Sequence, residues 1–255
     1  MKFLLLTITI VFLIGAQFLS AQDNQLDSMK FDQPVEPMEE SSPYFVVGGG
    51  YFGTLLKQNF TEINNFINKN NLGFDNNFDG WVYLHGGQGF VSALLGNFRL
   101  GFVSMSGSKT LNKIIDTLGT NRSFVDNISF IGLSLDYAFV LHKRWAILPG
   151  IGFGFGSIKL ESYQSAPNND WSTKEDANFN YYKVYSSNNI YFQPNLNIEW
   201  APSPITMIRV GIGYPLTYWY DWKFNNNGSL SGVPTGLKSD GMTIQFGLLL
   251  GLFNY

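Results

Sequence analysis

Apolar residues recur at every second position along two long stretches of this chain. The first runs from residue 190 to residue 200, and its apolar positions are Ile190, Phe192, Leu196, Ile198 and Trp200. The second runs from residue 208 to residue 222, and its apolar positions are Ile208, Val210, Ile212, Tyr214, Leu216, Tyr218, Tyr220 and Trp222. A period of two places side chains on opposite faces of a β-strand and does not fit an amphipathic helix. The chain is therefore predicted to be all-β.

The same alternation predicts eight strands, separated by clusters rich in Asn, Asp, Gly and Ser. They cover residues 44–55, 80–90, 97–106, 127–141, 145–161, 187–200, 207–222 and 241–253. The connections between them contain 24, 6, 20, 3, 25, 6 and 18 residues, so long and short connections alternate. Successive turns of an up-and-down sheet lie at opposite ends. All four long connections are therefore expected at one end and the three short turns at the other.

The placement of charge indicates which medium the strands face. Only 14% of residues are charged, compared with about 25% in soluble domains. Five charged residues fall clearly within a strand phase, and all five lie in the phase opposite the apolar one: Arg99, Asp136, Glu199, Arg209 and Asp221. That phase otherwise carries mostly Gly, Ser, Thr, Asn and Gln. A soluble barrel would have the reverse pattern, so we expect an apolar outer wall that faces lipid and a polar lumen.

Residues 44–255 resemble the eight-stranded barrels of bacterial outer membranes, of the general type of the membrane domain of outer membrane protein A. The resemblance depends on the alternating strands and on the last segment, Met242-Thr-Ile-Gln-Phe-Gly-Leu-Leu-Leu-Gly-Leu-Phe-Asn-Tyr255. It implies an eight-stranded antiparallel up-and-down transmembrane β-barrel, surrounded by outer-membrane lipid, with long extracellular loops and short periplasmic turns. It also implies that the C-terminal strand, which ends on an aromatic residue, is read by the barrel-insertion machinery.

The first 43 residues are expected to precede the barrel. Residues 1–21 contain an apolar run too short to cross a membrane as a helix, and they are predicted to be a cleaved signal peptide. Residues 22–43 carry six acidic residues and three prolines, which predicts a disordered acidic segment. Residues 44–255 then hold 14 Lys+Arg and 13 Asp+Glu, with no basic stripe, so nucleic acid is not an expected partner.

Two motifs match ligand-binding patterns only in part. Gly48-x-Gly50-x-x-Gly53 copies a dinucleotide fingerprint, but that site requires a βαβ unit, so a glycine-rich barrel strand is the preferred interpretation. Asp75-x-Asn77-x-Asp79-Gly80 copies the first half of a calcium loop, whose twelfth position is Gly86 rather than Glu. Turn chemistry is favoured there. A weak metal candidate therefore remains at Asp75, Asn77 and Asp79, and no cofactor is expected.

The first long connection contains one short helical pattern. Asn59-x-x-Glu62 begins it, and the residues on its apolar side are Phe60, Ile63, Phe66 and Ile67. A folded cap over the barrel mouth is the preferred interpretation, and a lid or a knob that binds a partner is the alternative.

Hydrolytic chemistry would need a base, and the two histidines of the chain are His85 and His142. His142 lies in a predicted tight turn. His85 is assigned to the lumen with Trp81 and Tyr83, and no Ser or Asp partner is evident for a triad. The chain is therefore not expected to be an enzyme.

Four of the strand charges are predicted to meet at the periplasmic end of the lumen: Arg99, Asp136, Glu199 and Arg209. Glu199 and Arg209 flank a short turn, so they are expected to be neighbours across two strands. An unpaired charge in so narrow a space would be costly, which predicts a neutral ion-pair network that blocks passage. Gating of ions is the alternative role.

These features favour a non-enzymatic barrel that acts as a scaffold for four long extracellular loops, with structural or binding roles toward an unidentified extracellular ligand. The aromatic residues of the third long connection are compatible with binding a glycan or a protein. A porin-like narrow channel or small-ligand carrier is the first alternative, and a membrane-embedded enzyme is the second.

Overall fold

The computed structural model describes residues 44–254, apart from 71, 93–95, 115–119 and 166–180. The predicted signal peptide and acidic segment lie outside the described residues. The helix and strands, in chain order, are β1 (Phe45–Gln58), α2 (Thr61–Lys69), β2 (Val82–Val91), β3 (Phe98–Ile114), β4 (Asn121–Tyr137), β5 (Phe139–His142), β6 (Trp145–Ser165), β7 (Tyr181–Ser203), β8 (Thr206–Gly213), β9 (Leu216–Phe224), β10 (Gly228–Ser229) and β11 (Gly241–Asn254).

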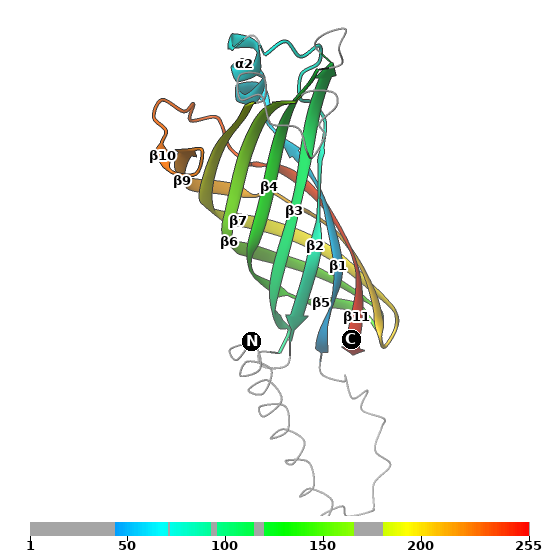
Figure 1. Cartoon of the computed structure of the whole chain (residues 1–255). Helices are drawn as coiled ribbons and strands as arrows, with labels where there is room; N and C mark the ends of the chain where they lie inside the picture. The colour runs from blue at the N-terminus through cyan, green and yellow to red at the C-terminus, as the bar shows by residue number, and fades with distance from the viewer. Residues whose placement is uncertain (1–43, 71, 93–95, 115–119, 166–180, 255) are drawn as a thin grey trace, which may run out of the picture. The chain divides into compact units, whose positions relative to one another are not determined.

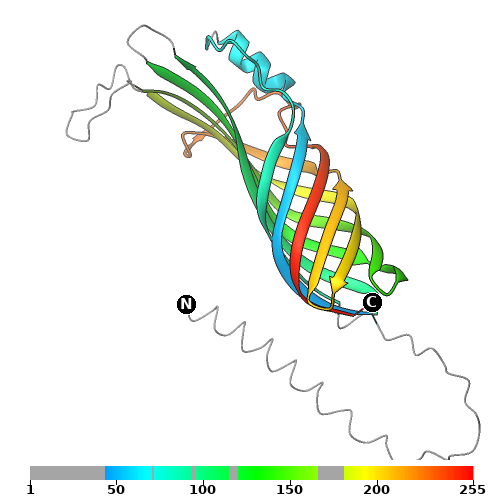
Figure 2. The same cartoon turned by 90° about the vertical axis from the view of Figure 1, so that its right-hand side faces the viewer.

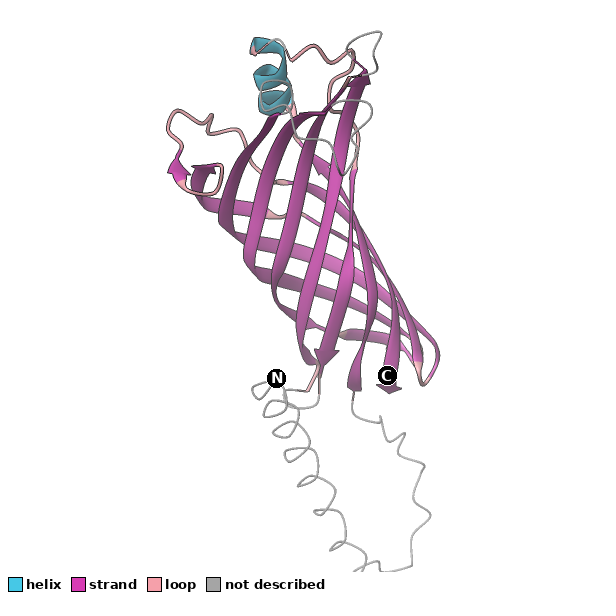
Figure 3. Cartoon of the chain, in the orientation of Figure 1, coloured by secondary structure: helices cyan, strands magenta, loops and turns pink. Residues whose placement is uncertain are grey.

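The strands form one antiparallel sheet that closes on itself (Figures 1 and 3). Around the ring the order of paired strands is β1, β2, β3, β4, β6, β7, β8 and β11, and β11 pairs with β1 to close it. β5 continues β4 beyond Ala138, while β8 and β9 are two parts of one strand that both pair with β7. The ring of the described residues therefore has eight strands, which confirms the predicted fold class. No helix among these residues is long and apolar enough to cross a membrane.

Two hairpins extend much further than the sequence pattern predicts (Figure 2). β3 and β4 remain paired up to Ile114 and Asn121, so the predicted second long loop over residues 107–126 is wrong: most of it is strand. β6 and β7 remain paired up to Gln164 and Tyr181. The upper parts of these hairpins are rich in Ser, Thr, Asn and Lys. The prediction relied on apolar alternation, and backbone pairing does not require it.

The strand formed by β8 and β9 changes face near its upper end. Trp219 has a positive φ of 57°, and the pairing with β7 is irregular between Asn188 and Ile190. One extra residue in a strand moves all later side chains to the opposite face. Trp222 consequently lies inside, whereas the Asp221 side chain is 77% exposed. The predicted faces of these two residues are therefore wrong.

Candidate functional site

Four buried charged side chains form a connected network inside the barrel near its short turns. Arg99 on β3 donates to Oδ2 of Asp136 on β4, at 3.3 Å from Nε and 2.7 Å from Nη2. Its Nη1 lies 2.6 Å from Oε1 of Glu199 on β7, and the same oxygen accepts a 2.7 Å hydrogen bond from Nε of Arg209 on β8. None of the four side chains is more than 2% exposed. Their formal charges cancel, so the group is neutral as a whole.

The structure thus brings together the four residues that the sequence predicts to meet at one end of the lumen. Two of the contacts follow from strand register, because Arg99 lies opposite Asp136 and Glu199 lies opposite Arg209. The contact between Arg99 and Glu199 joins β3 to β7, which do not pair, so it crosses the interior.

Two residues of β2 complete the network. The ring of Phe90 lies 4.5 Å from Cζ of Arg99 and 5.0 Å from Cζ of Arg209, within the range of cation–π attraction. Gln88 accepts a hydrogen bond from Nη1 of Arg209 through Oε1. Sequence reasoning missed both residues. Their alternation with the inward-facing Leu84 is the signal that could have identified them.

An apolar layer fills the barrel below this network, at the short-turn end. Its buried members are Tyr44, Val46, Phe90, Ala138, Ala146, Leu148, Ala201, Met207, Leu249 and Phe253. Because these side chains come from strands all around the ring, they pack across the lumen. Charge and apolar packing therefore follow one another along the same narrow interior.

Above the network the interior is first polar and then apolar. A cavity of about 30 Å³ lies among side chains that include Gln193, Asn197 and Gln245, which is room for about one water molecule. Further up, a large buried cluster contains residues such as Leu56, Met105 and Phe130, which alternate with outward-facing side chains. The expectation of a polar lumen is therefore wrong for this upper part. Inside and outside are both apolar here, so the alternation of polarity that guided the prediction disappears.

The helix α2 covers the upper interior. Oδ1 of Asn59 accepts a 3.0 Å hydrogen bond from the backbone N–H of Thr61, and Ile63 and Ile67 are buried in the upper apolar cluster. The Asn64 amide bonds both the N–H and the carbonyl of Phe78, at 2.8 and 2.9 Å, which fixes the segment that follows the helix. The predicted helix is confirmed, and its apolar side faces into the barrel.

An open cleft of about 440 Å³ lies beside α2 at the long-loop end. One wall is the helix, the floor is formed by strands of the barrel, and the other wall is the segment between β10 and β11. The lining residues are Glu62, Ile63, Asn65, Phe66, Lys69, Asn70, Leu160, Tyr185, Trp222, Leu230, Ser231, Gly232, Val233, Pro234 and Leu237. Sequence reasoning missed this site, although four apolar residues between positions 230 and 237 of a surface loop are a usable signal.

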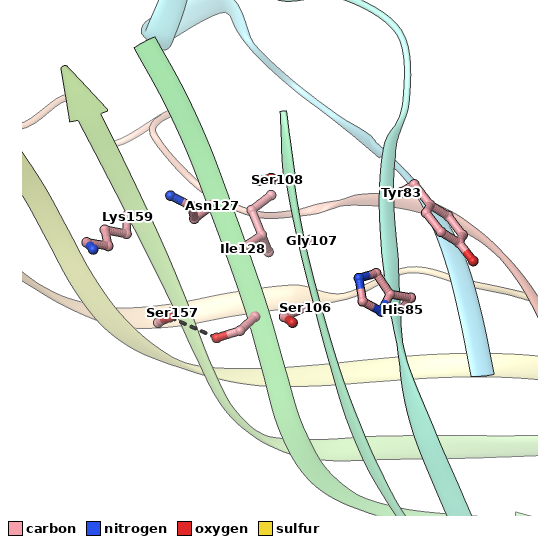
Figure 4. Close-up of a pocket in the computed structure, with 10 residues that line it drawn as sticks. Tyr83, His85, Ser106, Gly107, Ser108, Asn127, Ile128, Ser157 and Lys159 are labelled. Atoms are coloured by element: carbon pink, nitrogen blue, oxygen red, sulfur yellow. Dashed lines mark hydrogen bonds between the residues drawn. The ribbon is translucent and has the colours of Figure 1, made fainter. Parts of the chain in front are cut away.

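A second hollow, of about 520 Å³, lies on the outer wall of the barrel (Figure 4). Its residues come from β2, β3, β4 and β6: Tyr83, His85, Ser106, Gly107, Ser108, Asn127, Ile128, Ser129, Ser157 and Lys159. The assignment of His85 to the lumen is wrong, because Leu84 and Gly86 take the inward positions and the imidazole faces outward beside the Tyr83 ring. Lys159 forms an ion pair with Glu161, which offsets the positive charge of this hollow.

Both aspartates of the weak metal candidate at Asp75, Asn77 and Asp79 contact lysines. Oδ1 of Asp75 lies 2.6 Å from Nζ of Lys113, and the carbonyl oxygen of Asp79 accepts a hydrogen bond from Nζ of Lys109. An ammonium group beside each aspartate disfavours a bound cation. Within the residues that the structure describes, no three His, Cys, Asp or Glu side chains gather as a metal site would require.

The outer wall shows which solvent surrounds the barrel. On β6 the outward residues from Trp145 to Phe155 are apolar, and Ser157 and Lys159 follow. On β7 the outward residues from 190 to 200 are apolar as well. Each stretch covers 11 residues, the length that a tilted strand needs to cross a bilayer. The protein is a closed β-barrel whose outer wall carries an apolar belt of the height that a bilayer requires.

No family model matches this chain, and no curated protein matches its sequence. Among solved structures, the chain is similar to a major outer membrane protein from Thermus thermophilus, with 8% identity and a TM-score of 0.44 over 81% of this chain and 99% of that one. It is also similar to Ail, the attachment invasion locus protein of Yersinia pestis. The Ail complex with the heparin analogue sucrose octasulfate matches with 10% identity and a TM-score of 0.38, over 82% of this chain and 97% of that one.

Proposed function

We propose that this protein is a closed, non-enzymatic barrel that holds an extracellular binding surface in the outer membrane. The observation that supports this most strongly is the filling of the lumen. Along one interior path, an apolar layer is followed by the ion-pair network and then by the large upper cluster beneath α2. An eight-stranded barrel is just wide enough for side chains to fill, so a path for solutes would need several layers to move together.

The binding role is supported by the long-loop end of the barrel, which the proposal places outside the cell. α2, the segment between β10 and β11 and the two tall hairpins all lie on this side (Figure 1). Rigid strands hold these parts in place, and binding residues are commonly presented in this way on loops and on the ends of elements. The proposal assigns recognition to this surface and sealing to the interior.

Conductance of the purified protein in planar bilayers tests the closed state. We expect no steady conductance from the wild type or from Asp221→Asn, whose charge lies outside the lumen. Glu199→Gln and Arg209→Gln should remain closed as well, because the apolar layers on both sides of the network are unchanged. Steady, ion-selective conductance of the wild type would favour the narrow-channel alternative and refute the proposal.

A further inference from the structure

The cleft beside α2 has an apolar body. Phe66, Tyr185 and Trp222 supply aromatic surface from three different elements, and Leu230 and Val233 supply aliphatic surface from the facing segment. Ligand sites typically have volumes of 300–1,000 Å³, apolar linings and a few polar groups that orient the ligand. The cleft, at about 440 Å³, has these properties and lies at the long-loop end, which the proposed function places outside the cell.

The two charges that line the cleft have opposite signs and stand near opposite ends of α2, which forms one wall. Glu62 lies in the first turn of α2 and Lys69 in the last. Seven residues of helix correspond to two turns, so both lie on the same face, about 10 Å apart along the axis. Neither side chain forms an ion pair with another part of the chain that the structure describes.

We propose that the cleft binds a short peptide with apolar side chains and two free termini. Its ammonium group would pair with Glu62 and its carboxylate with Lys69, while its side chains cover the aromatic floor around Trp222. This assignment depends on the proposed extracellular binding role and makes it specific.

The spacing of the charges sets the length of the peptide. An extended chain advances about 3.3–3.6 Å per residue, so a separation of about 10 Å corresponds to about three residues. The apolar lining favours Leu, Val or Phe side chains over polar ones. A neutral apolar molecule would fill the same space without engaging either charge, which allows the two kinds of occupant to be separated by experiment.

Isothermal titration of the full barrel in lipid nanodiscs tests the assignment with the tripeptide Leu-Val-Leu, in its free, N-acetylated and C-amidated forms. We expect the free peptide to bind and each modification to weaken binding about tenfold, the effect of losing one charged hydrogen bond. In Glu62→Gln, binding of the free peptide should weaken about tenfold and N-acetylation should have no further effect. Lys69→Gln should remove the effect of C-amidation in the same way.

Two control variants make the outcome decisive. Asp221→Asn and Lys223→Gln remove exposed charges on β9 that do not line the cleft, and they should bind like the wild type. Equal binding of free and modified peptides, or no binding, would overturn the assignment. If the peptide assignment fails but the barrel shows no steady conductance, the proposal of a closed scaffold still stands. If the peptide binds as expected but the barrel conducts, only the closed scaffold is refuted.

Discussion

Removal of the Glu199 carboxylate should destabilise the barrel more than any exposed charge change. Its Oε1 accepts hydrogen bonds from both Arg99 and Arg209, at 2.6 and 2.7 Å, and the side chain is fully buried. In Glu199→Gln the neutral amide can accept only part of the hydrogen bonds that Arg99 and Arg209 donate to the carboxylate. The site then holds two buried guanidinium groups against one carboxylate. Breaking a buried ion pair by removing one partner costs about 3–5 kcal/mol, which is the loss we expect in the free energy of unfolding.

A double-mutant cycle separates this charge imbalance from a simple loss of contacts. In Glu199→Gln combined with Arg209→Gln, Arg99 and Asp136 remain as a neutral pair. The double variant should therefore be more stable than the sum of the two single losses predicts, by about 1–3 kcal/mol. Asp221→Asn is the matched control, because its exposed carboxylate should matter by less than about 0.5 kcal/mol.

Urea unfolding in lipid vesicles measures these values when the folded fraction is read from the heat-dependent mobility of the barrel on gels. The linear dependence of the free energy of unfolding on urea concentration gives each variant's stability. Additive losses in the cycle, or a Glu199→Gln variant within about 0.5 kcal/mol of the wild type, would refute the charge-imbalance reasoning.

Three further variants test other parts of the structure by the same unfolding assay. Phe153→Arg places a charge in the apolar belt of the outer wall and should lower the free energy of unfolding by about 2–4 kcal/mol. Ser157→Arg, on the same face of β6 above the belt, should lower it little, and equal losses would contradict the position of the belt. Asp126→Asn, at a fully buried carboxyl without an ion-pair partner among the described residues, should leave stability equal or higher, and a loss would contradict this. Ile63→Ala should cost about 2–5 kcal/mol and increase proteolysis within α2; resistance equal to the wild type would show that the helix is not held by its apolar side.

Local and register-based features could be predicted from the sequence alone. The eight strands and the outward faces of their apolar residues follow from a period-two pattern whose physical basis is the pleat of the strand. Glu199 and Arg209 could be paired because a short turn joins their strands. The helix at Thr61–Lys69 could be predicted because its apolar residues repeat at helical spacing above a polar background.

Other features were decided only by the closed barrel. The contact of Arg99 with Glu199 joins residues a hundred positions apart, and it depends on how the ring closes rather than on any local pattern. The bulge at Trp219 reversed the faces of Asp221 and Trp222, since one added residue shifts every later side chain. The cleft beside α2 depends on the packing of a helix, barrel strands and a loop that approach one another only after closure. Alternation of polarity in the sequence indicates which face of a strand is polar. The neighbours of a side chain across the lumen depend on how the sheet closes in three dimensions, and the sequence pattern of a single strand does not encode this.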